Sequence, residues 1–342
     1  MGSVLRVERV LKADDPFRDW LLELAGERIR NRKCNVLVSE VMPSSHSVRK
    51  YKFQGENYAV AAKFFAKPSG IIRRYNAEEA MENEYRILTA IEGTIPIPRP
   101  LGRSRDFSCA LITEWMQGDT FGHLMKSQHN GSLPRHLTLL ANLHRRIHAY
   151  RSGIFDKERI FSGYNRIFHT LRLRPRDRDR FEHLLSAWRD QPLLDLSCGH
   201  RIHGDANPNN YILHGKQFHA LDFEQSWDQA HPIHDVGIIC TELTHFFATK
   251  RGDPHLAKEY IHHYLHQYCR DERDLEEITQ VLPFFMSYGY MRIARLYRNT
   301  PYQDYIVQEA LELLDSGQKT LPRRSALLTP AWTSESAKGT RA

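Results

Sequence analysis

One short segment limits what this chain can fold into more than any other part of the sequence. Residues 203–210 read His-Gly-Asp-Ala-Asn-Pro-Asn-Asn, and a second acidic residue, Asp222, follows beyond a predicted short hairpin. Asp205 can accept a proton from a hydroxyl group, while Asn210 and Asp222 supply the oxygen ligands that Mg²⁺ prefers. The pattern therefore predicts a phosphoryl-transfer site, and the fold must present the loop and the hairpin together.

Chance is a weak explanation of this pattern. If all residue types were equally frequent, the four fixed letters of H-G-D-x-x-x-x-N would recur at about one position in 10⁵. An Asp-Phe pair at Asp222 and an Asp-Val-Gly at Asp235 follow downstream. The alternative is a turn rich in Asp, Asn and Pro that only separates two strands.

The constellation resembles the aminoglycoside phosphotransferase family, a branch of the protein-kinase-like fold whose members phosphorylate hydroxyl groups of small molecules. In that family the loop reads His-Gly-Asp rather than the His-Arg-Asp of protein kinases, and His203, Gly204 and Asp205 match it. The resemblance covers roughly residues 35–314. It implies an α+β, bilobal protein-kinase-like fold with a sheet-rich N-terminal lobe and a helical C-terminal lobe. ATP and Mg²⁺ are the implied cofactors, with GTP as an open alternative to ATP.

The same resemblance implies a role for each residue of the motif. Asp205 would be the catalytic base, and Asn210 and Asp222 would be the magnesium ligands. Asp235 would be an internal anchor that ties the catalytic loop to the following helix, and His203 would be structural, packed beneath the loop.

The spacing after Asp222 argues against a protein kinase. A protein kinase needs a segment between its Asp-Phe-Gly and Ala-Pro-Glu motifs to bind and orient a peptide. Here Asp235 stands only thirteen positions after Asp222, no Ala-Pro-Glu follows, and Glu224 replaces the final Gly of Asp-Phe-Gly. A small acceptor that enters an open cleft fits this spacing better than a polypeptide.

Upstream, β-branched and aromatic residues alternate with polar ones and predict three antiparallel strands. The expected strands span residues 36–42, 48–53 and 58–65, with Gly55-Glu56-Asn57 as the second turn. The first turn, residues 43–47, falls where kinases place a loop over the nucleotide phosphates. It has no glycine, so hydroxyl and backbone N–H groups at Ser45 and Ser47 are the candidate phosphate contacts.

Lys63 lies within an apolar run, Val-Ala-Ala-Lys-Phe-Phe, of the third predicted strand. Its ammonium group needs a polar partner, and nucleotide phosphates together with an acidic side chain supply one. Apolar spacing predicts a helix over residues 76–91 with Glu84 near its inward face, so Glu84 is the predicted partner. The alternatives are a Lys63 side chain that points to water from an edge strand, and a helix register that presents Glu78, Glu79 or Glu82 instead.

Residues 110–116 are predicted to form a strand that leads to the hinge between the lobes. Adenine would bind there through backbone groups near Glu114 and Met116, although a buried strand without a ligand would have the same pattern. We therefore expect a nucleotide-binding lobe over residues 1–116 and a catalytic, acceptor-binding lobe over residues 117–315. Residues 316–342 hold few apolar side chains, which predicts a loosely ordered tail.

The second lobe is expected to be mostly helical. Apolar residues recur at helical spacing over residues 137–149, 235–248, 255–268, 274–296 and 302–314. The first of these segments resembles a family helix with a repeated Leu-His pattern, and core packing is the expected role of His144 and His148. A further amphipathic helix is expected near the N-terminus, over residues 17–29.

The formal net charge of +7 raises the question of nucleic acid as a partner. The basic residues are dispersed, however, and the sequence contains no specific nucleic-acid motif. The densest run, residues 172–180, is interrupted by two acids and a proline. It predicts a solvated loop between helices, with contact to an anionic acceptor or a membrane surface as the alternative.

The remaining composition fits a cytoplasmic enzyme with a small-molecule hydroxyl acceptor as partner. No apolar stretch reaches the length of a transmembrane segment, and the oligomeric state is open. The five cysteines are scattered without disulfide or zinc spacing, which indicates a reducing compartment. Three histidines at 262, 263 and 266 could hold a metal only with a further ligand that the sequence does not place nearby.

Charge also bears on the identity of the acceptor. A polycationic aminoglycoside needs a carboxylate-rich cleft, whereas Glu224, Asp228 and Glu242 are scattered acids in a basic chain. A neutral or anionic hydroxyl compound, such as a sugar or glycan precursor, is therefore expected. Trp227 would stack on an apolar sugar face and Asp228 would accept from a hydroxyl, unless Trp227 only packs in the core.

Three other functions stay open at this point. They are an antibiotic kinase of the aminoglycoside type, a protein or RNA kinase, and a non-catalytic nucleotide-binding scaffold. A scaffold would be expected to have lost part of the catalytic set, and the sequence keeps all of it: Lys63, Asp205, Asn210 and Asp222.

Overall fold

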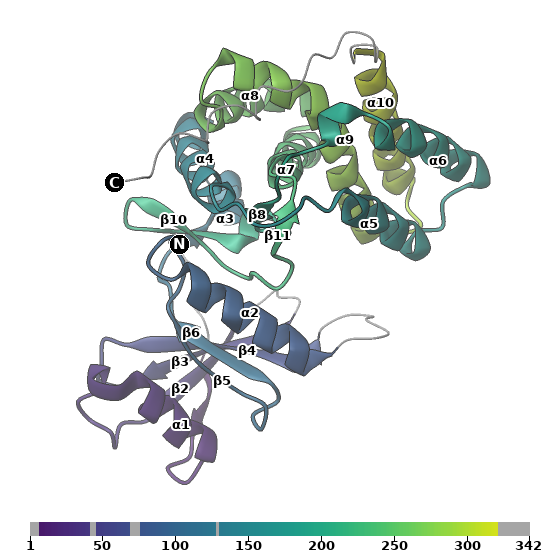
Figure 1. Ribbon diagram of the computed structural model, residues 1–342. Coiled ribbons are helices and arrows are strands. Elements are labelled where there is room, and N and C mark those ends of the chain that lie inside the picture. Colours follow the sequence, from purple (N-terminus) through teal and green to yellow (C-terminus); the bar gives the residue numbers. More distant parts are fainter. Residues whose placement is uncertain (1–6, 42–45, 69–75, 128–129, 321–342) are drawn as a thin grey trace, which may run out of the picture. The chain divides into compact units, whose positions relative to one another are not determined.

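The computed structural model describes residues 7–41, 46–68, 76–127 and 130–320 (Figure 1). The chain forms two compact units: Met1–Leu124 with Asn209–Gln225, and Met125–Pro208 with Ser226–Ala342. Strands dominate the N-terminal region and helices the C-terminal part, which confirms the predicted α+β class. The predicted lobe boundary between residues 116 and 117 stays a prediction. It did not anticipate that the later segment Asn209–Gln225 belongs to the first unit.

The first unit is built on a six-stranded antiparallel sheet in the order β1-β2-β3-β4-β6-β5. The strands are β1 (Val7–Leu11), β2 (Val36–Val41), β3 (His46–Phe53), β4 (Ala59–Pro68), β5 (Pro100–Ser104) and β6 (Ala110–Glu114). The alternating pattern thus predicted β2, β3 and β4 correctly. The strand expected over residues 110–116 is confirmed as β6.

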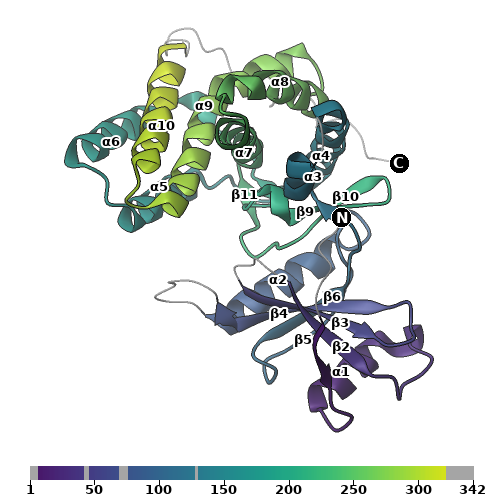
Figure 2. The same cartoon turned by 180° about the vertical axis from the view of Figure 1, so that it is seen from behind.

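Two helices cover opposite faces of this sheet, α1 (Pro16–Ala25) and α2 (Ala77–Ile91) (Figures 1 and 2). Successive strand residues point to opposite faces. On β4, Val60, Ala62 and Phe64 therefore join the buried core under α1, while Lys63 points toward α2. The side chain of Asn76 accepts from the backbone N–H of Glu79 and begins α2 where the sequence predicted it.

The N-terminal helix is shorter than expected. The predicted segment spans residues 17–29, whereas α1 ends at Ala25, where Gly26 has a φ of 56°, and a 3₁₀ helix over Gly26–Arg28 follows. This left-handed backbone conformation favours glycine and stops the helix.

A small three-stranded sheet completes the first unit. Its order is β10-β9-β7, from β7 (Asp119–Thr120), β9 (Tyr211–His214) and β10 (Gln217–Ala220). Strands β9 and β10 are the hairpin expected between the two acidic motifs. The backbone N–H of Ala220 donates to the carbonyl of Pro96 at 2.9 Å, which fixes the end of the hairpin within this unit.

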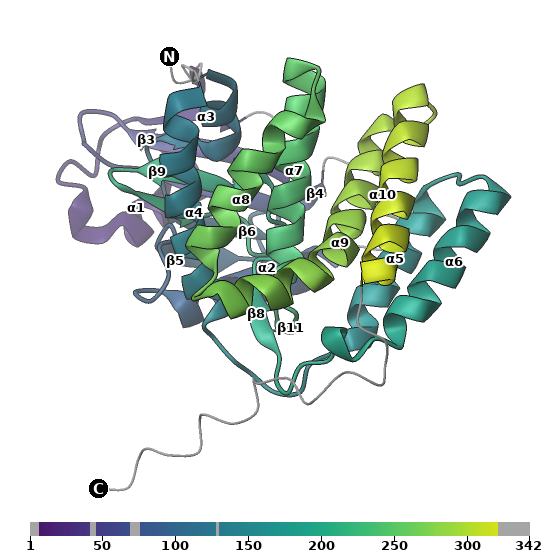
Figure 3. The ribbon, with the colours of Figure 1, turned by 90° about the horizontal axis from the view of Figure 1, so that it is seen from above.

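In its described part, the second unit contains helices and a two-stranded sheet, formed by β8 (His200–Ile202) and β11 (Trp227–Ala230). Figure 3 shows helices of this unit following one another in the order α4, α8, α7, α9, α10 and α6. Short α3 (Phe121–Ser127) connects the two units in sequence. The bounds of the other helices are α4 (Leu133–His148), α5 (Lys157–Thr170), α6 (Pro175–Arg189), α7 (Ile233–Arg251), α8 (Ala257–Tyr268), α9 (Glu272–Ala294) and α10 (Pro301–Thr320).

The prediction of a solvated loop over residues 172–180 was wrong from Pro175 onward, where α6 begins, although most of the segment is exposed as expected. Pro175 occupies the first turn of α6, where a proline has no hydrogen bond to lose, so it begins a helix instead of interrupting one. Asp177 in that first turn is largely buried and accepts from Arg174 at 2.8 Å and from Gln308 at 3.1 Å. These contacts tie the start of α6 to α10.

The predicted tail over residues 316–342 is corrected at its start. Helix α10 continues to Thr320, and the rest of this segment lies outside the described residues. The side chain of Gln318 donates to the carbonyl of Leu184 at 2.9 Å, and Trp188 donates to the carbonyl of Leu314 at the same distance. Contacts with α6 therefore extend α10 beyond its apolar sequence pattern.

Helices α7 and α9 approach closely at two glycines. A Cβ atom added at Gly237 of α7 would lie 2.7 Å from the carbonyl carbon of Phe285, and one added at Gly289 of α9 would lie 2.9 Å from Cβ of Thr241. Both distances are shorter than packed atoms tolerate. The two glycines thus permit the spacing that sets α9 against α7.

Among the described residues, no helix combines the length and the apolar character that a membrane crossing requires.

Candidate active site

Three acidic side chains of the first unit surround the ammonium group of Lys63. Lys63 Nζ donates to Asp222 Oδ1 at 2.6 Å, to Glu84 Oε2 at 2.8 Å and to Glu224 Oε2 at 2.9 Å. We call this set, with His46, the Lys63 cluster. Glu84, the partner predicted for Lys63, is one of these three acids. Two of the competing acids lie in exposed ion pairs elsewhere: Glu78 with Arg105 and Glu82 with Arg103.

The electrostatics of the cluster follow from burial and charge. Burial opposes the charge of Lys63, but the carboxylates of Asp222, Glu84 and Glu224 hold the Lys63 pKa well above its usual range. Burial raises the pKa of Glu84, against the attraction of Lys63. One ammonium group therefore faces three acidic side chains. This excess of acids would favour the binding of further positive charge.

His46 and Glu224 belong to the cluster, and the sequence did not assign them to it. His46 is buried at the start of β3, and its Nε2 atom lies 2.7 Å from Glu224 Oε2. Burial opposes the charge of Glu224, but His46 and Lys63 lower its pKa below the usual value. The signal in the sequence was the Asp-Phe-Glu order, which places two carboxylates only two positions apart.

Asp222 has an unusual backbone conformation, with a φ of 62°. Non-glycine residues rarely adopt this region, and such strain is often found at functional sites. The next residue, Phe223, is fully buried and donates its backbone N–H to Glu84 Oε1 at 3.2 Å. Glu84 therefore holds both Lys63 and the backbone beside Asp222.

Asn210 lies in the first unit with Asp222. It ends a short 3₁₀ turn, Pro208–Asn210, and its carbonyl accepts from the backbone N–H of Leu221 at 2.8 Å. This bond pairs the two ends of the β9–β10 hairpin. An amide oxygen and a partly exposed carboxylate suit Mg²⁺ in their chemistry.

Among the described residues, one group of three potential acidic ligands has its oxygen atoms within 4.8 Å of one another: Glu84, Asp222 and Glu224. The ammonium group of Lys63 accounts for this grouping without an ion. The assignment of Asn210 and Asp222 as metal ligands therefore stays a prediction.

In the second unit, Asp235 joins the His-Gly-Asp segment to helix α7. Its carboxylate is fully buried and accepts from the backbone N–H of His203 at 2.6 Å and of Gly204 at 3.0 Å. It also contacts His148 Nε2 at 3.1 Å. Burial opposes its charge, but the bonds from His148 and His234 hold the pKa of Asp235 well below its usual range. This geometry matches the anchor role expected of Asp235.

The ring of His203 supports the loop from within. The side chain is fully buried, and its Nδ1 atom accepts from the backbone N–H of Asp205 at 3.3 Å. The family resemblance implied this placement beneath the loop.

Asp205 itself is partly exposed and forms an ion pair with Arg292 of α9. Burial acts against the charge of Arg292, but Asp205 raises the Arg292 pKa above its usual value. On α7, burial raises the pKa of Glu242 to about 7, against the opposing effect of Arg292. The sequence motifs gave no sign of Arg292. Its position in the apolar run Tyr-Met-Arg-Ile-Ala could have indicated a charge in need of a partner.

The two residues expected to contact the acceptor have other neighbours. Asp228 forms a two-pronged ion pair with buried Arg201, at 2.6 and 3.0 Å, and the guanidinium of Arg201 also covers the ring of Tyr150. The ring of Trp227 lies 4.3 Å from the guanidinium carbon of Arg159. A contact of either residue with an acceptor stays a prediction.

The residues predicted to bind the nucleotide elsewhere are partly placed. Glu114 ends β6, where it lies 3.4 Å from both Arg28 Nε and the hydroxyl of Tyr58, and half-buried Met116 follows it. Ser47 lies on β3 opposite Phe64. Ser45 lies outside the described residues.

The three neighbouring histidines of α8 do not converge. His262 and His266 contact each other at 2.9 Å, whereas His263 contacts Thr138 of α4 at 2.9 Å. His144 and His148 of α4 contact tyrosines of α8, which agrees with a packing role.

The sequence matches the family described as "Phosphotransferase enzyme family" over residues 41–278. No curated protein matches it.

Solved structures share the fold at low sequence identity. A protein from Ralstonia eutropha JMP134, provisionally described as an aminoglycoside phosphotransferase, has a TM-score of 0.57 at 16% identity, with 89% of this chain and 96% of that chain covered. An amicoumacin kinase in complex with AMP-PNP and Ca²⁺ has a TM-score of 0.56 at 15% identity, covering 82% and 88%. The ADP-bound aminoglycoside phosphotransferase APH(2'')-Ib has a TM-score of 0.54 at 11% identity, covering 89% and 98%. At these identities the likeness shows the protein-kinase-like fold.

Proposed function

The chain belongs to the phosphotransferase enzyme family, and on this premise we propose that it transfers the γ-phosphoryl group of ATP to a hydroxyl group of a small molecule, with Mg²⁺ as the metal. Relatives solved with AMP-PNP and with ADP support the use of a nucleotide. GTP is the alternative donor. A cytoplasmic place of action fits this chemistry and the five free cysteines.

The observation that carries the proposal is the Lys63 cluster. Lys63 of strand β4, Glu84 of the following helix and Asp222, which follows the β9–β10 hairpin, meet within hydrogen-bonding distance. Kinase-like enzymes need this combination to hold nucleotide phosphates. The separate anchoring of the His-Gly-Asp loop by Asp235 supports the same function, since it would fix the loop that carries the base.

Each residue then has a chemical task. Lys63 would neutralise the α- and β-phosphates, and Glu84 would hold Lys63 in place. Asp205 would orient the acceptor hydroxyl and take its proton, while Asp235 fixes the loop. Magnesium, when bound by Asn210 and Asp222, would screen the phosphate charge.

The remaining predicted contacts complete the proposal. Ser45 and Ser47 would donate to the phosphates, and the backbone near Glu114 and Met116 would bind the base. Trp227 and Asp228 stay candidates for the acceptor side.

For the acceptor, we favour a neutral or anionic hydroxyl compound such as a sugar or glycan precursor. The net charge of +7 slows the approach of a polycation over long range. An aminoglycoside acceptor is the second candidate, and the solved relatives support it.

The test is a phosphorylation assay with γ-labelled ATP, Mg²⁺ and pooled acceptors: sugars, sugar phosphates, amino alcohols, nucleosides and aminoglycosides. We expect a labelled product in at least one pool. Lys63→Met should abolish it, whereas the matched control Lys52→Met, at an exposed lysine of β3, should not. Absence of both labelled product and Mg-ATP binding would contradict the proposal.

A further inference from the structure

Three arginines lie at intervals of three residues at the end of α9 and just after it, and the first of them contacts the loop that carries Asp205. Arg292 lies in the last turn of α9, Arg295 begins the 3₁₀ helix η6 (Arg295–Tyr297), and Arg298 follows directly. Residues three apart lie on the same side of an α-helix and align in a 3₁₀ helix. We call these residues the arginine row. It spans roughly 9 Å along the helix axis.

The row is one electrostatic unit that starts at the catalytic base. Arg292 forms the ion pair with Asp205. Burial lowers the pKa of Arg295, and the charges of Arg292 and Arg298 act in the same direction. Asp205 and Glu242 are the acids beside Arg292, whereas Arg295 and Arg298 are exposed at the far end of the row. The mutual repulsion of the three guanidinium groups favours the binding of an anion there.

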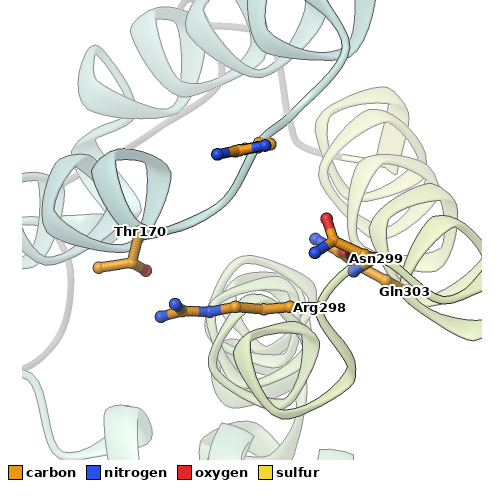
Figure 4. Close-up of a pocket in the computed structure, with 5 residues that line it drawn as sticks. Thr170, Arg298, Asn299 and Gln303 are labelled. Atoms are coloured by element: carbon orange, nitrogen blue, oxygen red, sulfur yellow. Dashed lines mark hydrogen bonds between the residues drawn. The ribbon is translucent and has the colours of Figure 1, made fainter. Parts of the chain in front are cut away.

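The far end of the row opens into a pocket of about 210 Å³. Its lining is polar throughout: Thr170, Arg172, Arg298, Asn299 and Gln303 (Figure 4). The side chain of Arg298 reaches across the pocket toward Thr170. No acid is among these five lining residues, although both arginines bring a full positive charge.

The donor groups of the pocket are arranged for an anion. Gln303 is largely buried, and its Oε1 atom accepts from the backbone N–H of Asn299 at 2.8 Å. That bond leaves the amide NH₂ of Gln303 to donate. Two guanidinium groups and amide donors match the three terminal oxygens of a phosphate group better than the hydroxyls of a neutral sugar.

We propose that the acceptor is an anionic hydroxyl compound, with its phosphate group bound between Arg172 and Arg298 and its reacting hydroxyl at Asp205. This inference rests on the proposed phosphotransferase function. The hydroxyl oxygen attacks the γ-phosphorus of ATP, the bond from that phosphorus to the bridging oxygen of the β-phosphate breaks, ADP leaves, and the hydroxyl proton passes to Asp205. The acceptor is thus a sugar phosphate or a compound of similar length and charge.

The first test compares acceptors matched in skeleton and different in charge. The panel contains glucose 6-phosphate, glucuronate and glucose, with kanamycin as a polycation of different skeleton, each assayed with Mg-ATP. We expect kcat/KM for glucose 6-phosphate to exceed that for glucose by about tenfold or more, since a charged hydrogen bond is worth about one order of magnitude. A higher value for glucuronate than for glucose 6-phosphate would assign the pocket to a carboxylate and overturn the phosphate assignment.

The second test removes the charges of the pocket. Arg172→Gln and Arg298→Gln should each raise the KM for glucose 6-phosphate by about tenfold, and by much less for glucose. The matched control is Arg178→Gln, at an exposed arginine of α6 outside the pocket, which should leave the KM values unchanged. Equal effects on charged and neutral acceptors would overturn the inference and leave the proposed function in place.

Binding separates the two failures if no acceptor of the panel is phosphorylated. Calorimetry with glucose 6-phosphate should then show binding to the parent chain that the Arg172→Gln, Arg298→Gln double variant has lost. No binding of glucose 6-phosphate to the parent overturns the anion pocket. No binding of Mg-ATP to the parent instead overturns the proposed function.

Discussion

Asp205 has Arg292 as its ion-pair partner, and this single carboxylate gives a direct test of the catalytic assignment. Asp205→Asn keeps the shape of the side chain and removes its ability to take a proton. We expect kcat to fall by a factor of ~10² to 10⁴, with nucleotide binding nearly intact. Initial rates and thermal shifts with Mg-ATP measure the two effects. Turnover within a factor of two of the parent would contradict the role of Asp205 as the base.

Asp222 supplies the corresponding test for the metal. Asp222→Ala should abolish the Mg²⁺-dependent part of nucleotide binding, because it removes a direct oxygen ligand. The measurement is the thermal shift with ATP in the presence and absence of Mg²⁺. Asp106→Ala, at an exposed acid of the same unit, is the control. If Mg-ATP stabilises the parent and the Asp222→Ala variant equally, the metal is bound elsewhere.

At the scale of single residues, motifs predicted the contacts that depend on short, fixed spacings. The pairing of Lys63 with Glu84 follows from one strand and the next helix, whereas the anchor role of Asp235 was implied by the family resemblance. His46 and Arg292 were not predicted, because their partners Glu224 and Asp205 lie far away in the sequence. Such contacts depend on tertiary register, which a single sequence does not show.

Helices α4 and α8 are joined by buried histidine–tyrosine contacts, which make their packing sensitive to acid. His144 Nδ1 lies 2.5 Å from the hydroxyl of Tyr264, and His148 Nδ1 lies 2.8 Å from that of Tyr268. Burial, with the nearby charge of His148, lowers the pKa of His144 to about 3. The folded chain therefore keeps this ring neutral at pH values where the unfolded chain protonates it.

The expected result is a loss of stability in acid. The folded pKa lies below the unfolded value of about 6.5, so the contribution of His144 is complete above about pH 6.5 and decreases as the pH falls toward 3. Within that window the free energy of unfolding should fall by about 1.4 kcal/mol per pH unit for this histidine. Urea unfolding at several pH values measures the slope.

A pair of variants isolates this effect. His144→Gln should reduce the pH dependence of the free energy of unfolding by ~1.4 kcal/mol per pH unit, the contribution of one histidine. His183→Gln, at an exposed histidine of α6, should leave it unchanged. Identical slopes for the parent and His144→Gln would contradict the assignment of a buried, neutral ring.

At the scale of elements, regular periodicity predicted well and interrupted patterns did not. The long helices α7 and α9 and the strands β2 to β4 follow from continuous spacing of apolar residues. Helix α6 was missed because its first turn carries Pro175 among alternating charges, a pattern that also suits a loop. Its helical state depends on contacts with α10, which lies far away in the sequence.

The whole molecule is divided in a way that the order of the sequence hides. Residues 209–225 complete the first unit, where β9 pairs with β7 and the ring of Phe218 packs against Phe121 at 5.7 Å. The fold class was predictable from local pattern and motif. The position of the β9–β10 hairpin in the first unit was not predictable, because pairing between strands that are distant in sequence leaves no local pattern in either strand.

A fragment of residues 1–124 therefore lacks part of its own core. We expect it to melt without a cooperative transition, since β7 and Phe121 lose their partners. Residues 209–225 joined to residue 124 by a short Gly-Ser linker should restore the transition, because Gly122 lies beside Asn209. Calorimetry of both fragments decides the point. A cooperative transition of equal temperature in the shorter fragment would contradict this view.

The close approach of α7 and α9 has a consequence for how a saturation mutagenesis of this gene would be interpreted. Gly237 and Gly289 carry no functional group, yet almost every substitution there would push the two helices apart. A screen scored by activity alone would rank them with Asp205 as intolerant. Measured cellular abundance would separate destabilised variants from catalytically inactive ones. Variants at the two glycines would be degraded in the cell, whereas Asp205→Asn would accumulate as inactive protein.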